Sequence, residues 1–238
     1  MDKSQFVSYI SRYYLGGLVE SVVWSVKDSI CTIDFYSPST STAGKLIFPF
    51  IHLSDDVDEF GVIDTTSLLK FLSPMNDELK IIPEKEYDIW MRLNISDNKF
   101  EGYYSLADIR RGIKKGPEVR EPKVFDVSFP IDKEFKTQFE KSYNALGKIN
   151  RFTIEAGEKI KITVGDKNSY SNKLSFSRIT SDYLPLRKIA FSADALFNIL
   201  KNNHEDGFLE ISDNGMMKIS FEFENGSVKY YLIQLEEV

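Results

Sequence analysis

The chain has 238 residues and a formal net charge of −6, with 42% hydrophobic and 28% charged residues. This is the composition of an ordinary globular protein, and no apolar run approaches the ~20 residues that a membrane span needs. The negative balance argues against a protein that coats nucleic acid by bulk attraction. The single cysteine, Cys31, excludes an internal disulfide, and its alternation with Ile33 and Phe35 predicts a core position. The N-terminus has no signal-peptide pattern, so we expect a cytoplasmic protein, in the host cytoplasm if a phage encodes it.

The first half of the chain predicts a helix, three strands, and then a strand, a second helix and a meander. The first helix, over residues 2–14, carries one apolar stripe and ends at Gly16-Gly17; the stripe comprises Phe6, Ile10, Tyr13 and Tyr14. Asp97-Asn98 is typical of a turn. The second helix is predicted to end at Leu72. One strand is predicted just before the second helix, from about residue 60. The other strands of this half are predicted at residues 19–26, 29–35, 45–51, 79–82, 87–96 and 99–106.

The second half predicts the same order of elements. Gly and Pro residues among charges mark residues 108–125 as a linker, and a helix follows at 131–146. Ser192 can cap a further helix that ends near Asn202. Asn-Gly pairs at 214–215 and 225–226 indicate two tight hairpin turns. The strands of this half are predicted at residues 151–155, 159–164, 173–179, 189–191, 208–212, 217–223 and 228–235.

The two halves share a sequence pattern at a constant spacing. Residues 63–72 align with residues 191–200 at an offset of about 128, so that Leu68 corresponds to Leu196 and Leu72 to Leu200. Upstream, Phe6 lies about 129 residues before Phe135. The chain is therefore interpreted as a duplicated domain, with each copy long enough to bury its own core.

Catalytic signatures are missing from the sequence. His52 and His204 lie at non-equivalent positions, and no Cys, His or carboxylate spacing suits a metal ion. No phosphate-binding loop or nucleophile motif is present. We therefore expect no enzyme activity, no metal and no cofactor.

The order of elements, the duplication and the tail resemble the DNA sliding clamps, the processivity rings related to proliferating cell nuclear antigen and to the tailed-phage clamps. Lys229-Tyr230-Tyr231-Leu232 is similar to the terminal strand of the eukaryotic clamp. Ser67-Leu68-Leu69-Lys70, followed by Asn76-Asp77-Glu78, resembles the second helix of the first clamp domain. The resemblance covers the whole chain.

This resemblance implies an α+β fold of the DNA-clamp type, with two topologically similar domains, each with two helices packed on antiparallel sheets. The domains would span residues 1–107 and 126–238, joined by the linker at 108–125. It also implies a non-catalytic homotrimer that encircles duplex DNA without reading its sequence. The length and the small tail suit a phage or other viral version, and a cellular origin stays open. The ring would tether the replicative DNA polymerase and receive the clamp loader.

In the family, the last strand of domain one pairs with a strand of domain two in the neighbouring subunit. The corresponding segments here are residues 100–106 and 174–179. They alternate or are rich in aromatic residues, as exposed pairing edges are. Two strands inside a sheet would show the same pattern. The interface residues that the resemblance implies are Phe100, Tyr103, Tyr104, Leu174, Phe176 and Ile179.

The clamp helices line the channel, so the resemblance places positive charge on them, facing phosphates. A solvated helix face would show the same residues, and the net excess of charge on the four helices is small. The DNA-facing candidates are Lys3, Arg12, Lys70, Lys133, Lys136, Lys141, Lys148 and Lys201.

The terminal strand is apolar on both faces, so one face needs cover beyond the domain core. The resemblance implies that polymerases and clamp loaders insert an anchor between this tail and the linker. Burial of the tail under the linker, with no partner, is the alternative. The partner-binding candidates are Ile113, Val119, Tyr231, Leu232 and Ile233.

A second function stays open from the sequence. A duplicated β-rich protein of a virion would also need edges that pair with other chains. An enzyme is the third alternative.

Overall fold

The computed structural model describes residues 1–37, 42–53, 58–111, 113, 115–147, 149–165, 171–179 and 183–236. The chain divides into two compact units. The first comprises Met1–Tyr36, Gly44–Glu118 and Glu224–Val228, and the second comprises Ser37–Ala43, Val119–Phe223 and Lys229–Val238. None of the helices in the described ranges is long and apolar enough to cross a membrane.

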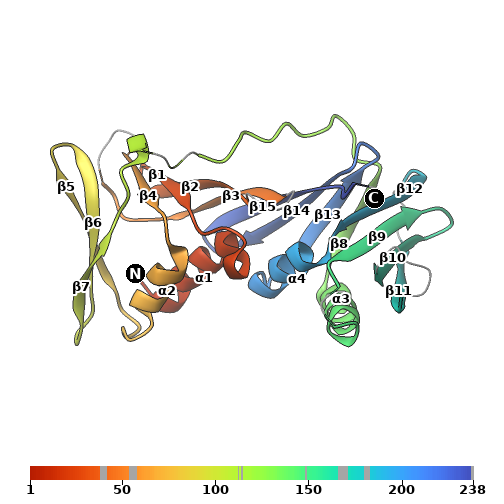
Figure 1. Ribbon diagram of the computed structural model, residues 1–238, viewed down its shortest axis with the longest axis horizontal. Coiled ribbons are helices and arrows are strands. Elements are labelled where there is room, and N and C mark those ends of the chain that lie inside the picture. The colour runs from red at the N-terminus through yellow and green to blue at the C-terminus, as the bar shows by residue number, and fades with distance from the viewer. Residues whose placement is uncertain are drawn as a thin grey trace. The chain divides into compact units, whose positions relative to one another are not determined.

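Two helices and two groups of strands build most of the first unit (Figure 1). Its elements are α1 (Lys3–Tyr14), η1 (Leu15–Gly17), β1 (Val22–Lys27), β2 (Ile30–Tyr36), β3 (Thr42–Pro49), β4 (Asp58–Val62), α2 (Thr65–Leu72), β5 (Lys80–Glu86), β6 (Ile89–Ser96), β7 (Glu101–Ser105) and η2 (Ile109–Arg111).

The second unit repeats this order after one additional strand. Its elements are β8 (Val127–Ile131), α3 (Lys133–Ala145), β9 (Arg151–Ala156), β10 (Ile160–Gly165), β11 (Lys173–Arg178), β12 (Leu186–Ser192), α4 (Ala193–Asn202), β13 (Gly207–Ser212), β14 (Met216–Phe223) and β15 (Gly226–Ile233).

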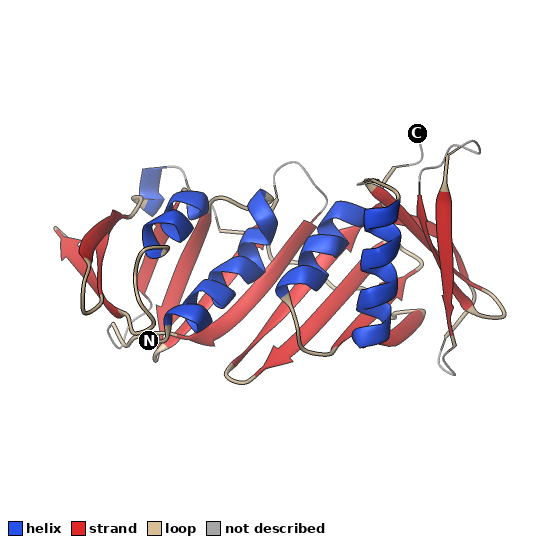
Figure 2. Ribbon diagram, turned by 90° about the horizontal axis from the view of Figure 1, so that it is seen from below, coloured by secondary structure: helices blue, strands red, loops and turns tan. Residues whose placement is uncertain are grey.

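The strands of both units follow one topology. The strand order β4-β1-β2-β3 of the first copy corresponds to β12-β9-β10-β11 in the second. The meander β5-β6-β7 likewise corresponds to β13-β14-β15. In each unit the helices lie against one face of the strands (Figure 2). The predicted α+β fold, with two topologically similar halves, is therefore confirmed.

A side chain just before each helix caps its N-terminus. The carboxylates of Asp2, Asp64 and Asp132 accept hydrogen bonds from the backbone N–H groups three residues later, at 2.8, 2.7 and 2.8 Å. Ser192 accepts from the N–H of Ala195 at 3.2 Å, which confirms the predicted cap. Each cap satisfies a donor that has no partner inside its helix.

Aromatic side chains fill the core of the first unit around Trp24, which is fully buried. Phe6 and Tyr13 of α1 meet the Trp24 ring edge-on, at centroid distances of 5.9 and 6.4 Å. Phe48 and Phe60 approach the same ring at 5.8 and 5.6 Å. The stripe predicted for the first helix therefore packs on its sheet. Such ring pairs add about 0.5–1.5 kcal/mol each beyond their burial.

The core of the second unit repeats this arrangement with phenylalanines. Phe135 of α3 lies 5.5 Å from Phe129 of β8, and Phe139 lies 5.2 Å from Phe152 of β9, between ring centroids. Phe152 in turn packs 5.9 Å from Phe191 of β12. The first helix of each copy thus covers its sheet with the same stripe.

Two local predictions were wrong. The helix predicted from residue 131 begins at Lys133, because residues 127–131 form strand β8. Pro130 does not prevent this strand, because β8 is an edge strand whose ladder bonds run to β13. Apart from the Val127–Tyr183 bridge, its other edge has no strand partner among the described residues. The strand predicted from Tyr87 begins at Ile89, since Tyr87 and Asp88 form a hairpin turn with φ values of 50° and 61°.

Other predictions were correct. Cys31 is fully buried in the core. The predicted turn at Gly215 joins β13 to β14 with a φ of 84°. The Asp97 carboxylate accepts hydrogen bonds from the backbone N–H groups of Lys99 and Phe100, both at 2.6 Å. These bonds close the predicted turn before β7. The backbone N–H of Asn76 also donates to this carboxylate, and this bond, together with those from Phe100 and Lys99, holds the pKa of Asp97 at about 2.

The duplication predicts equal behaviour at equivalent core positions. Leu68 of α2 and Leu196 of α4 are both fully buried. We expect Leu68→Ala and Leu196→Ala each to lower the free energy of unfolding by ~2–5 kcal/mol, because each change leaves a cavity. Urea unfolding measures this. The exposed Lys70 of α2 is the matched control, and Lys70→Ala should change the free energy by less than ~0.5 kcal/mol. A loss at Leu196 no larger than that of the control would contradict the repeat.

Candidate functional site

The cations predicted on the helices of the first unit have three different environments. Lys3 donates through Nζ to the carbonyl oxygens of Ser73, at 2.9 Å, and Met75. These carbonyls lie just beyond the end of α2, so Lys3 ties the start of α1 to the segment that follows α2. The Arg12 side chain is buried, with 3% of the residue exposed. Lys70 is exposed on α2.

Lys136 of α3 repeats the role of Lys3 in the second unit. Its Nζ donates to the carbonyl oxygen of His204, at 3.0 Å, and to that of Glu205, both beyond the end of α4. The same ammonium lies 5.5 Å from the centroid of the Phe221 ring. Lys136 is therefore engaged in holding α3 to the segment that follows α4.

Three other predicted cations of this unit are exposed to solvent on α3 and α4. These are Lys133, Lys141 and Lys201. Lys148 lies outside the described residues. Of the eight predicted DNA-facing cations, four in the described ranges are thus exposed, counting Lys70. These four exposed cations lie on helices of both units, and their placement does not test contact with DNA.

Strand β7 forms an edge of the meander β5-β6-β7 and carries exposed aromatic side chains. Tyr103 is 53% exposed, and Phe100, just before the strand, is also exposed. Tyr104 points the other way: its hydroxyl donates to the backbone oxygen of Asp64 at 2.8 Å, and its ring lies 6.2 Å from that of Phe71. Tyr104 therefore belongs to the interior of the first unit.

Strand β11 is an edge of the sheet β11-β10-β9-β12. Leu174 is 41% exposed, and Ile179, just beyond the strand, is 95% exposed. Phe176 lies against the helix, with its ring 5.9 Å from that of Phe135. Each predicted interface segment thus places one set of apolar side chains in its own core and another set in solvent.

The terminal strand β15 has one face in the core, as predicted. Tyr230 and Leu232 are fully buried. The opposite face is only partly covered, because Tyr231 is buried whereas Ile233 is 42% exposed. The tail beyond it is held by the backbone, since Gln234 N–H donates to Gly215 and Leu235 N–H donates to Ala190, both at 2.8 Å.

Glu121 of the linker covers Tyr231. The Tyr231 hydroxyl donates to Glu121 Oε1 at 2.7 Å, and Lys218 Nζ lies 3.2 Å from Glu121 Oε2. Lys218 also contacts Glu210 at 2.7 Å. Burial alone would raise the pKa of Glu121, but the bonds from Tyr231 and Lys218 hold it below its ordinary value. We call Glu121, Lys218 and Tyr231 the linker latch.

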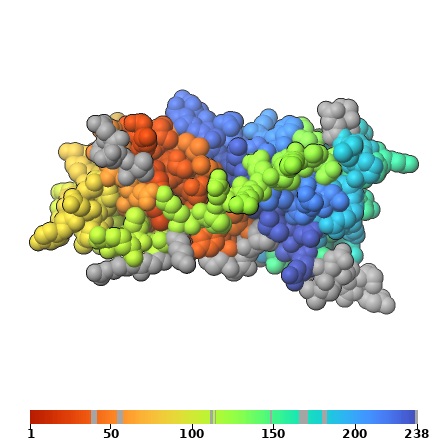
Figure 3. Space-filling model, turned by 90° about the horizontal axis from the view of Figure 1, so that it is seen from above, coloured from red at the N-terminus to blue at the C-terminus, as the bar shows by residue number. Residues whose placement is uncertain are grey.

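The linker is also fixed to the first unit by its earlier residues. Ile113 lies against Gly61 of β4, where an added Cβ would come within 2.5 Å of Ile113 Cδ1. Gly116 N–H donates to the carbonyl oxygen of Asp34 at 3.1 Å, and Lys115 pairs with Glu59. Val119, half-buried, belongs to the second unit together with the linker latch. The linker runs along the surface as an extended segment (green in Figure 3).

Sequence reasoning missed the linker latch. It predicted Tyr231 as part of an open partner site, but Tyr231 is bonded to the linker. Glu121 lies within a basic linker and Lys218 within an alternating strand, and neither position carries a local signal for the other. Only the fold brings these two charges together. Among the described residues, no group of His, Cys, Asp and Glu side chains could hold a metal ion.

Comparisons with protein families and with curated proteins found no match. No protein-family model matches the chain, and no curated protein matches it either.

Solved structures match the chain over nearly its whole length. A. fulgidus PCNA, in a structure with the C-terminal region of FEN-1 bound, is similar with a TM-score of 0.79 and 16% identity, over 100% of this chain and 98% of that one. Proliferating cellular nuclear antigen from Entamoeba histolytica is similar with a TM-score of 0.75 and 16% identity, over 99% and 97% of the two chains. A PCNA2-PCNA3 complex from Sulfolobus tokodaii has a matching chain, with a TM-score of 0.73 and 13% identity, over 98% and 97%.

These matches include both copies of the repeat, all four helices and the sheets on which they pack. The likeness that the order of elements and the tail predicted is therefore confirmed at the level of the fold. The chain has the DNA sliding-clamp fold of the proliferating cell nuclear antigens.

Proposed function

We propose that the chain is a non-catalytic sliding clamp, a homotrimer that encircles duplex DNA and tethers a replicative polymerase. The observation that carries this proposal is the match of the complete chain, both copies included, to sliding-clamp structures. A fold alone hosts several functions. The proposal therefore also rests on three surfaces of this chain: two strand edges, the exposed helix cations and the tail.

The outer edges of strands β7 and β11 are the surfaces that we propose to close the ring. Each has an edge without a strand partner among the described residues, β7 in the first unit and β11 in the second. An unpaired edge with apolar side chains is a site for pairing with another chain. Because the two edges belong to different units, their pairing is head-to-tail, and three copies would close it into a cyclic ring.

The exposed helix cations suit weak, sequence-independent contact with phosphates. Few such cations remain once Lys3 and Lys136 are assigned to carbonyls and Arg12 to the interior. A small number of phosphate contacts gives low affinity and a shallow salt dependence. This is what a ring that slides along DNA requires.

The tail is the surface that we propose to receive polymerase and clamp-loader peptides. Ile233 is exposed beside the buried end of β15, and Val119 lies in the adjoining linker. One of the similar structures carries the C-terminal region of FEN-1 on a PCNA, which supports peptide docking as a mode of binding. A peptide that seats an apolar anchor at Ile233 would bind next to the linker latch.

Assembly is tested by the mass of the particle in solution. We expect light scattering at micromolar concentration to give a mass near three times the 27.4 kDa of one chain. Tyr103→Asp should shift the mass towards one chain, because it places a negative charge on the proposed pairing edge. The matched control is Tyr87→Asp, at a 96% exposed turn position of the same meander. A wild-type mass of one chain, or an unchanged mass for Tyr103→Asp, contradicts the ring.

The helix cations are tested by their effect on synthesis. Lys133→Ala combined with Lys141→Ala should shorten the tracts that polymerase and loader make on a primed circular template. Each lysine that contacts phosphate should contribute about one unit to the slope of log K against log salt. Lys161→Ala removes an exposed lysine from the sheet and is the control. Equal tract lengths for all three proteins at physiological salt would remove these lysines from the proposal.

The tail is tested with a peptide from the polymerase. Ile233→Ala should weaken binding by about 1–2 kcal/mol, the scale of an interface anchor, without loss of stability. Ile30→Ala is the control, because Ile30 has the same 42% exposure in the first unit. Tyr231→Ala is a poorer test, since Tyr231 is buried and bonded to Glu121. Titration calorimetry measures both variants, and equal affinities for them would contradict the site.

A further inference from the structure

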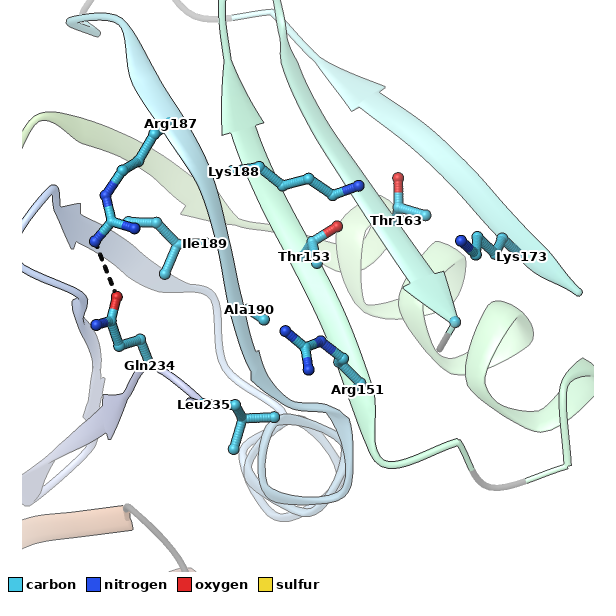
Figure 4. Close-up of a pocket in the computed structure, with 11 residues that line it drawn as sticks. Arg151, Thr153, Thr163, Lys173, Arg187, Lys188, Ile189, Ala190, Gln234 and Leu235 are labelled. Carbon is cyan, nitrogen blue, oxygen red and sulfur yellow. Dashed lines mark hydrogen bonds between the residues drawn. The ribbon is translucent and has the colours of Figure 1, made fainter. Parts of the chain in front are cut away.

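A pocket lies on the sheet β11-β10-β9-β12 of the second unit, on the face away from α3. Phe152 of β9 contacts Phe139 of α3, and side chains alternate along a strand, so Arg151 and Thr153 point to the opposite face. On that face the strands and the tail enclose a cavity of about 200 Å³ (Figure 4). The cavity adjoins two of the surfaces proposed for the clamp, because Lys173 lies on the edge strand β11 and Leu235 lies in the tail, but its cations have no part in the proposed clamp function.

Strand pairing builds the floor of the cavity. Thr153 of β9 is paired with Ala190 of β12 on one side and with Thr163 of β10 on the other. Thr163 is paired with Ser175 of β11, and their hydroxyls lie 2.8 Å apart. A row of small and hydroxyl-bearing side chains therefore crosses the sheet and leaves space above it.

Two irregularities direct lysines to this floor. The register of β12 shifts between Leu186 and Ile189, and such bulges re-aim side chains, here those of Arg187 and Lys188. On the other side of the cavity, Lys173 is paired with Gly165. A Cβ at Gly165 would lie 2.7 Å from Lys173 Cγ, so the absence of a side chain there leaves space for the lysine. Figure 4 shows the Lys188 side chain reaching across the strands towards Thr163.

The cavity holds an excess of positive charge. Arg187 is committed to neighbours, since it donates to Asp213 at 3.1 Å and to Gln234 at 3.0 Å. Arg151, Lys173 and Lys188 have no carboxylate partner in the part of the chain that the structure describes. This contrasts with other surface cations of the same sheet: Lys161 pairs with Glu155 at 3.4 Å. Three uncompensated cations around one small cavity favour an anion within it.

We infer that this pocket binds a single phosphate group, either free phosphate or the phosphoryl group of a modified side chain on a partner protein. A phosphate carries about −1.5 to −2 charges near pH 7 and three or more acceptor oxygens, which matches guanidinium, ammonium and hydroxyl donors arriving from four strands. The net charge of the chain, −6, and the acidic residues Glu155 and Asp213 nearby disfavour a longer polyanion such as DNA.

The test is titration of the full chain with inorganic phosphate by calorimetry, at constant ionic strength. We expect saturable binding in the millimolar range or tighter. Arg151→Gln with Lys188→Gln should weaken it by roughly tenfold per cation removed, because each loses a charge-assisted bond. The control is Lys161→Gln, on the same sheet but outside the cavity, which should bind as the wild type does. If circular dichroism shows that the double variant is misfolded, the single variant Lys173→Gln is used in its place.

A second arm distinguishes the two sources. A phosphoserine peptide and its serine counterpart are titrated alongside inorganic phosphate. Equal affinity for phosphate and phosphopeptide supports the site with free phosphate as its ligand. Tighter binding of the phosphopeptide supports it with a partner protein as the source. No saturable binding of either, or binding that the double variant and Lys161→Gln leave equally unchanged, overturns the inference.

Discussion

The structure depends on burial of one aromatic stripe on the first helix of each unit. In the first unit Phe6 and Tyr13 close over Trp24. In the second unit Phe135, the equivalent of Phe6, packs together with Phe139 on the sheet. A helix that buries such a stripe must turn its opposite, polar face to solvent. The same packing therefore leaves both units with one helix-covered sheet face and an exposed polar helix surface. Among the described residues, β7 and β11 each also have a strand edge without a partner. These are the surfaces on which the proposed function rests.

Side-chain roles on the helices were the least predictable part of the site. Periodicity assigns a residue to a face, but Arg12 lies at the border of the stripe and is buried. Lys3 and Lys136 are long enough to bend back to carbonyls at the end of the neighbouring helix. Their partners are about 70 residues away in the sequence, with separations of 70 and 68. Tertiary contacts of this kind leave no local signal, as the bond between Glu121 and Tyr231 also shows.

The fold itself was more accessible, because most of its signals are local. Alternating strands, Asn-Gly turns and helical stripes fixed the order of elements, and the repeat supported each assignment twice. The exceptions have physical causes. Strand β8 contains Pro130 and follows a linker composition, so it looked like the approach to a helix. The turn at Tyr87 and Asp88 uses positive φ without glycine or asparagine, which local preference does not reveal.

The central claim is that copies of this chain close around a passage for duplex DNA, and imaging of single particles by electron microscopy tests it most directly. The account predicts closed particles of three chains with a central hole, wider than the B-DNA that must pass through it. Particles of one chain at concentrations that saturate assembly, or open chains without a hole, would contradict it.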